Sequence, residues 1–102
     1  MFAVLYRWSV RAGHEEQFTE AWTAMTVSIR EQCGSFGSRL HRSADGTWVA
    51  YALWPDEATW QACTPDDREA GAAMAAAIEE DHEPLRLDVV TDLLSPGDQR
   101  SP

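Results

Sequence analysis

The chain contains no lysine and no asparagine, and only two of its 102 residues are cysteines. Its eight basic side chains are therefore all arginines, against 17 acidic ones, and the formal net charge is −9. Without a basic stripe, nucleic acid and anionic membranes are poor partners. No apolar run approaches the length of a membrane span, and the first residues lack the basic start of a signal peptide. We therefore expect a cytoplasmic protein.

Cys33 and Cys63 are the two cysteines, and their spacing is not that of a CxxC motif. In a cytoplasmic chain, two such cysteines are expected to be reduced, half-buried thiols. Glu79 and His82 have the Glu-x-x-His spacing of di-iron bundles. Because the second copy of that motif is missing, we expect no metal site.

Apolar residues make up 44% of the chain, which indicates a globular protein rather than a disordered one. The length suits one domain with one core. We expect this domain to span residues 1–94. Residues 95–102 show no pattern and are expected to form a flexible tail.

Alternating side chains predict a strand from Phe2 to Val10, and a helix is expected after Gly13. Apolar residues recur along this helix at helical spacing: Phe18, Trp22, Met25 and Ile29. Cys33-Gly34 is expected to close the helix, because glycine readily takes the left-handed conformation found there.

The stretch 34–60 predicts a strand over residues 36–42, a hairpin turn at Asp45-Gly46 and another strand over 48–54. This second strand of the hairpin is apolar on both faces, whereas a half-solvated sheet shows one polar row. Pro55 stops the strand. Asp56 is expected to cap a short helix that carries Trp60.

An alanine-rich helix is predicted over residues 66–81, with Thr64 as its cap, Pro65 at its first position and Asp67 in a capping box. Pro84 ends the helical region, and residues 85–94 alternate as a last strand. The order β-α-β-β-α-β predicts an α+β, ferredoxin-like domain. Its four-stranded antiparallel sheet would carry both helices on one face.

The other face of this sheet is expected to present Leu5, Val49, Tyr51 and Leu53. Burying a large apolar side chain contributes roughly 1.5–3 kcal/mol, so leaving four of them in water forgoes several kcal/mol. Pairing two sheets in a two-fold dimer recovers this free energy. We therefore expect a homodimer.

Two segments of the chain resemble the antibiotic biosynthesis monooxygenase (ABM) domain family of the dimeric α+β barrel group: YRWSVRAGHEEQFTEAW at residues 6–22 and GSFGSRLHRSADGTWVAYALWPDEATW at 34–60. The resemblance implies a homodimer whose sheets pack into a barrel, with a cavity between helices and sheet in each subunit. Some members oxidise planar polycyclic phenols with molecular oxygen and without metal or flavin. Others degrade haem, so the fold alone does not decide the activity.

The pattern of the haem-degrading branch is not met. Tyr6 stands where that branch has an asparagine, Cys63 stands where it has a tryptophan, and residues 66–80 contain no histidine. We therefore expect that the protein does not degrade haem and that it uses no cofactor.

Aromatic residues supply the candidate ligand pocket. On this hypothesis a flat aromatic ligand lies against a wall of Tyr6, Trp8, Trp22, Trp54 and Trp60, with Tyr6 hydrogen-bonded to a ligand oxygen. The competing interpretation is that these side chains fill the core, where aromatics generally dominate the energetics. His41 is expected on the dimer side of the sheet, either as a base or as a contact across the interface. No catalytic residue is identified.

Three functions stay open. The first is a cofactor-independent monooxygenase that acts on an aromatic phenol or quinol. The second, from a different class, is a non-catalytic, small-molecule-binding or stress-related dimer that uses the same cavity. The third is a structural partner protein whose own aromatics fill the cavity.

Overall fold

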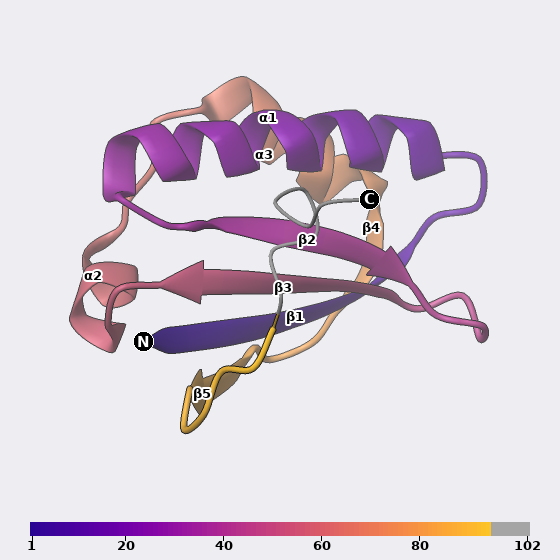
Figure 1. The fold of residues 1–102 in the computed structure, drawn as a ribbon. Helices are drawn as coiled ribbons and strands as arrows, with labels where there is room; N and C mark the ends of the chain where they lie inside the picture. The colour runs from indigo at the N-terminus through magenta and orange to yellow at the C-terminus, as the bar shows by residue number, and fades with distance from the viewer. Residues whose placement is uncertain (95–102) are drawn as a thin grey trace, which may run out of the picture.

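The computed structural model describes residues 1–94 and consists of a sheet with helices packed on one side (Figure 1). The regular elements begin at Phe2 and end at Asp88, so Met1 and residues 89–94 flank them. In chain order, these elements are β1 (Phe2–Val10), α1 (Glu15–Cys33), β2 (Gly37–Arg42), β3 (Trp48–Trp54), α2 (Glu57–Ala62), α3 (Arg68–Ala77), β4 (Ile78–Asp81) and β5 (Leu85–Asp88).

The sheet is antiparallel and is built around β1. Strand β3 pairs with one edge of β1, from Phe2 opposite Trp54 to Trp8 opposite Trp48. Strand β2 continues the sheet beyond β3, while β4 and β5 share the other edge of β1. The order β2-β3-β1-β4, with α1 and α3 on one face, confirms the predicted α+β, ferredoxin-like fold.

The last strand differs from the prediction. Instead of one strand over 85–94, β4 and β5 form two short strands separated by His82-Glu83-Pro84, and residues 89–94 have no regular structure. Proline lacks the N–H that a sheet ladder needs, so a break beside Pro84 is expected on chemical grounds. The sheet therefore has five strands rather than four. The predicted tail, residues 95–102, lies outside the described residues.

The predicted helix over 66–81 is also shorter in the structure. Helix α3 ends at Ala77, and Ile78 already pairs with Val10 in the sheet. Its N-cap is Asp67, whose carboxylate accepts a hydrogen bond from Ala70 N at 3.1 Å, so the predicted cap at Thr64 is wrong. The unpaired edge of β1 takes residues 78–81 as a strand, which overrides the weak helix preference of the local sequence.

Other signals from the sequence are confirmed. Gly34 follows α1 with φ 77°, a left-handed conformation that glycine adopts without strain. Asp56 caps α2 and accepts a hydrogen bond from Thr59 N at 2.7 Å. Asp45 stabilises the β2–β3 turn, where hydrogen bonds from Ser43 and Thr47 lower the pKa of its carboxyl to about 2.

The core lies between the helices and the facing side of the sheet. Strand β3 buries alternate residues, and Phe18 of α1 is fully buried between the rings of Trp8 and Trp48. Two clusters result. The first holds Trp8, Phe18, Trp48, Ala50 and Ala77, and the second holds Phe2, Val4, Ala52 and Trp54.

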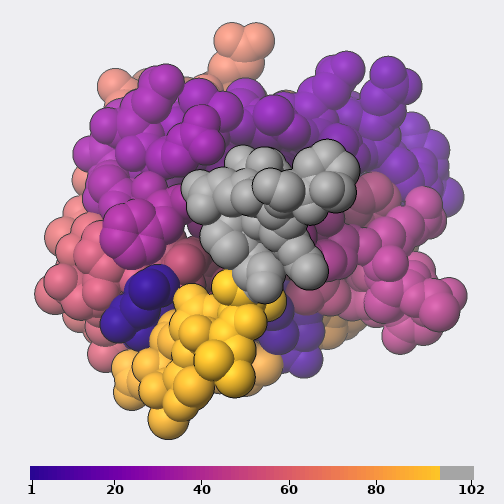
Figure 2. Space-filling model, in the orientation of Figure 1, coloured from indigo at the N-terminus to yellow at the C-terminus, as the bar shows by residue number. Residues whose placement is uncertain are grey.

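The opposite side of the sheet, which we call the open face, carries Leu5, Val49, Tyr51 and Leu53, as predicted. Together with Phe36, which is 58% exposed, they line a broad groove of about 690 Å³. The C-terminal segment shown in yellow in Figure 2 lies against the N-terminus, where Val89 N donates to Met1 O at 3.0 Å. Within residues 1–94, no helix combines the length and the apolar character that a bilayer crossing requires.

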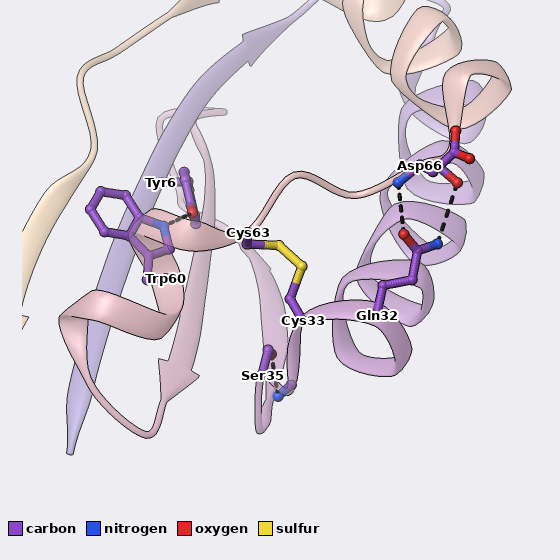
Figure 3. Close-up of a disulfide and its surroundings, with 8 residues drawn as sticks. Tyr6, Gln32, Cys33, Ser35, Trp60, Cys63 and Asp66 are labelled. Carbon is purple, nitrogen blue, oxygen red and sulfur yellow. Dashed lines mark hydrogen bonds between the residues drawn. A yellow bond between two sulfur atoms is a disulfide. The ribbon is translucent and has the colours of Figure 1, made fainter.

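The two cysteines form a disulfide, so the prediction of two reduced thiols is wrong (Figure 3). Cys33 ends α1 and Cys63 follows α2, and their Cα atoms lie 5.3 Å apart although 30 positions separate them in sequence. Next to the disulfide, Gln32 Oε1 accepts from Asp66 N at 2.7 Å and Gln32 Nε2 donates to Asp66 O at 3.3 Å. The chain between α2 and α3 is thus attached to the end of α1 by one covalent bond and two hydrogen bonds.

Candidate functional site

The candidate site is a cavity of about 180 Å³ between the helices and the sheet, which we call the aromatic cavity. Strand β1 supplies two rings to its wall, and the apolar stripe of α1 supplies residues at helical spacing. The residues that line it are Tyr6, Trp8, Trp22, Met25, Thr26, Ile29, Ser35, Ser38, Ala52, Trp54 and Met74.

The aromatic residues singled out in the sequence do not all reach this cavity. Tyr6, Trp8, Trp22 and Trp54 line it. Trp60 lies beside Tyr6 instead, and its indole Nε1 donates a hydrogen bond to the Tyr6 hydroxyl oxygen at 2.9 Å (Figure 3). Trp60 therefore does not line the cavity itself but is hydrogen-bonded to a residue that does.

Several lining residues were not assigned to a pocket from the sequence, although the signal for some of them was present. Met25 and Ile29 belong to the helical stripe of α1, and Ala52 shares the face of Trp54 on β3. Met74 lies on the apolar side of α3. These periodicities identify a buried face, but they do not distinguish a residue at a cavity from one in solid core.

Tyr6 contributes a phenolic hydroxyl to the lining of this cavity. Burial raises the pKa of its hydroxyl above the ordinary value, an effect that the hydrogen bond from Trp60 partly offsets. Tyr6 is therefore neutral at physiological pH. An indole N–H is only a donor, so the Tyr6 oxygen acts as acceptor in this bond. The phenolic proton is left to be donated elsewhere, and no hydrogen bond within residues 1–94 uses it.

The rings around Tyr6 hold one another in place. The planes of Tyr6 and Trp8 are 3° from parallel, with centroids 5.7 Å apart. Trp8 in turn meets Phe18 edge to face, with centroids 5.3 Å apart. Such pairs add to the packing of a core. The wall of the cavity is therefore a preformed aromatic surface.

Trp54 contributes a second polar group. Its indole nitrogen is buried and has no hydrogen-bond partner in the described part of the chain. An unmade hydrogen bond in a buried site has an energetic cost. Trp54 lines the cavity, so its ring belongs to the site even though its N–H is unpaired.

The sequence contains a Glu-x-x-His motif at Glu79 and His82, at which we expect no metal site. His82 Nε2 lies 3.5 Å from Glu80 Oε1, so its carboxylate neighbour is Glu80 rather than Glu79. Within residues 1–94, no group of three or more His, Cys, Asp or Glu side chains is arranged to hold a metal ion. His41 lies at the open face, where its Nδ1 is 3.1 Å from Val49 O.

Comparison with known proteins places the chain in a family. The model of the ABM family, described as antibiotic biosynthesis monooxygenase, matches residues 1–68. The protein therefore belongs to the ABM family, in agreement with the resemblance found in its sequence. No curated protein matches the chain in sequence.

Solved structures resemble the whole domain. SnoaB from Streptomyces nogalater, described as a cofactor-independent oxygenase, is 17% identical, with a TM-score of 0.74 over 92% of this chain and 97% of that chain. Rv0793 from Mycobacterium tuberculosis is 18% identical, with a TM-score of 0.73 over 91% of this chain and 98% of that chain. At such identities the likeness establishes the fold alone.

Proposed function

We propose that this ABM protein is a cofactor-independent monooxygenase whose substrate is a small aromatic phenol or quinol held in the aromatic cavity. The observation that carries the proposal is the cavity itself. It is lined by the rings of Tyr6, Trp8, Trp22 and Trp54, and the hydroxyl of Tyr6 is neutral and has a proton to donate.

The proposed chemistry relies on the substrate and molecular oxygen. A phenol that loses its proton becomes an electron-rich anion, and this anion reduces oxygen. In an anthrone-type substrate, one O₂ converts a ring CH₂ into C=O; one oxygen atom stays in the product, and the other leaves as water with the two hydrogens. The protein holds the flat ring, donates a hydrogen bond to the ligand oxygen from Tyr6 and keeps water away from the intermediate.

The size of the cavity narrows the substrate class. A protein cavity of about 150 Å³ holds benzene, and the aromatic cavity measures about 180 Å³. One ring fits inside it, and a larger ligand has to extend beyond its wall. We therefore propose a substrate with a single phenolic ring at the buried end.

Removing the Tyr6 hydroxyl tests this proposal. Tyr6→Phe is expected to weaken binding of a phenolate or quinol about 10- to 100-fold, because a hydrogen bond to a charged oxygen contributes about 1.5–3 kcal/mol. Binding is measured by quenching of tryptophan fluorescence. Turnover is measured as oxygen uptake with one-, two- and three-ring quinols and anthrones.

The matched control is Tyr51→Phe, because Tyr51 lies on the open face of the sheet. This variant is expected to bind and turn over the panel as the wild type does. Equal affinity and rate in Tyr6→Phe and the wild type would remove Tyr6 from the site. No oxygen uptake above buffer across the panel would contradict the monooxygenase proposal.

A second candidate function is favoured by one feature of the cavity. Apart from indole N–H groups, which only donate hydrogen bonds, its polar lining groups are the hydroxyls of Tyr6, Thr26, Ser35 and Ser38, and a hydroxyl does not readily accept a proton at neutral pH. Such a lining suits a non-catalytic, small-molecule-binding dimer. Quenching by the quinols without oxygen consumption would select this function.

A homodimer is part of the proposal. The open face carries Leu5, Val49, Tyr51 and Leu53 beside the exposed Phe36, and a two-fold axis would place this apolar surface against its own copy. An apolar sheet face of this kind is costly to leave in water. A second copy of the chain is therefore the proposed occupant.

A cytoplasmic location also remains a proposal, and the disulfide makes it testable. Disulfides persist in oxidising compartments, and cytosolic ones are mostly transient or redox-active. Trapping thiols with an alkylating reagent in intact cells is expected to show Cys33 and Cys63 partly reduced. A fully oxidised pair, recovered in an extracellular or periplasmic fraction, would contradict a cytoplasmic location.

A further inference from the structure

The monooxygenase reaction proposed above requires a group that removes the phenolic proton. The aromatic cavity does not supply it. Tyr6 holds its own proton because burial raises its pKa, and the other polar lining groups are the hydroxyls of Thr26, Ser35 and Ser38 and indole N–H groups, which only donate. A base has to reach the ligand from an adjoining part of the molecule.

A second hollow adjoins the aromatic cavity, and we call it the side groove. It measures about 500 Å³, and Tyr6, Trp8 and Met74 line both spaces. Met74 is unbranched and flexible, so its side chain can adapt to a ligand that passes it. The remaining lining residues of the side groove are Gly71, Ala75, Ile78, Asp81, His82 and Pro84.

His82 is the one imidazole at the side groove. Its backbone N–H donates to Arg7 O at 3.2 Å, which fixes this residue to the edge of β1. Its Nε2 lies 3.5 Å from Glu80 Oε1. Because Nε2 is the nitrogen near that carboxylate, we assign the proton of the neutral ring to Nε2 and the accepting lone pair to Nδ1.

The other two histidines lie elsewhere. His14 Nδ1 is 3.4 Å from Ala12 O at the start of α1, and His41 lies on the open face. Neither of them lines the aromatic cavity or the side groove.

Charged groups around His82 come from two elements and the loop that follows it. Glu80 and Asp81 of β4 precede it, and Glu83 follows it. From β1, the Arg7 guanidinium donates to Glu83 O at 3.5 Å. The residues of α3 that line the side groove, Gly71, Met74 and Ala75, carry no charge. The carboxylates of Glu80, Asp81 and Glu83 and the guanidinium of Arg7 are therefore the charged groups next to His82 in sequence or in contact with its loop.

We propose that His82, oriented by Glu80, is the base that ionises a phenol reaching from the aromatic cavity past Met74 into the side groove. In this step the phenolic O–H bond breaks, its electron pair stays on the ligand oxygen, and the proton moves to His82 Nδ1. The resulting imidazolium faces the Glu80 carboxylate. The phenolate then reduces molecular oxygen, the oxidant of the proposed function on which this step rests.

Binding of 4-nitrophenol, whose phenolate absorbs visible light, tests the proton transfer without requiring turnover. Wild-type protein is expected to raise the phenolate-to-phenol ratio of the bound probe about tenfold over the free probe at the same pH. His82→Gln and His82→Asn are expected to abolish this shift and to retain quenching of tryptophan fluorescence by the probe. His14→Gln is the matched control and is expected to behave as the wild type does.

Glu80 is a positioning residue, so Glu80→Gln is expected to reduce the shift about threefold without abolishing it. Oxygen uptake on the quinol panel gives an independent readout. It is expected to be slower in His82→Gln than in the wild type and unchanged in His14→Gln.

The outcomes separate the two proposals. An unchanged phenolate shift in His82→Gln overturns the role of His82, even if oxygen is consumed. A shift that depends on His82 without oxygen uptake supports the base and contradicts the monooxygenase. A wild-type protein that neither binds nor ionises the probe contradicts the phenol site as a whole.

Discussion

Breaking the Cys33–Cys63 disulfide is expected to lower the free energy of unfolding by about 3–4 kcal/mol, because a cross-link of this span removes that much chain entropy from the unfolded state. The half-cystines are separated by 30 positions. The measurement is urea unfolding, followed by tryptophan fluorescence, of three samples: oxidised wild type, reduced wild type and the double variant Cys33→Ala/Cys63→Ala.

The double variant also provides the control, because reductant has no disulfide to act on in it. Its unfolding curve is expected to be the same with and without reductant and to fall near that of the reduced wild type. Coincident curves for oxidised and reduced wild type would show that the bond contributes nothing to stability. The reductant is expected to reach the disulfide of the folded protein, because both half-cystines border a surface hollow with Thr59 and Thr64.

Placing a carboxylate on the open face is expected to convert a dimer into a monomer. Leu53→Glu adds a charge to the apolar surface that the second copy would cover, and burying an unpaired charge is very costly. The dissociation constant of the dimer is expected to rise at least about 100-fold. Sedimentation velocity or light scattering across a dilution series measures it.

The matched control is Val27→Glu, which makes the same kind of change at an exposed apolar residue of α1. This variant is expected to keep the mass of the wild type. A folded wild type that sediments as a single protomer at micromolar concentration would contradict the dimer proposal. Equal loss of association in both variants would show that the open face is not the interface.

The regular elements could be predicted because local chemistry dominates where they begin and end. Gly34 takes a left-handed conformation after α1, and Asp56 caps α2 through Thr59 N. Strand β3 alternates buried and partly exposed residues as its sequence predicts. Each of these signals depends on neighbours along the chain, so one sequence suffices to recognise it.

The end of α3 could not be predicted in the same way. Local alanine content favours continuing the helix through residues 78–81, and helix propensities are weak per residue. In the folded chain Arg11 N donates to Ala77 O at 2.8 Å, and Ile78 pairs with Val10. Pairing with a distant strand decides where this helix stops.

The candidate site illustrates the same division. Aromatic residues at strand and helix spacing indicated a ring-lined layer, and Tyr6, Trp8, Trp22 and Trp54 do line the aromatic cavity. The sequence also predicts Trp60 in this aromatic wall, because tryptophan is a residue type that suits one. Its indole instead donates to Tyr6, a contact between residues 54 positions apart.

By itself, the sequence determined the α+β order of elements, the two apolar faces of β3, the end of α1 at Gly34 and the start of α2 at Asp56, since all of these follow from periodicity and from residues a few positions apart. Only the tertiary structure decided the pairing of Cys33 with Cys63, the hydrogen bond between Trp60 and Tyr6 and the position of His82 in the side groove. The physical reason is distance along the chain. These contacts arise when packing brings remote segments together, and no local pattern encodes them.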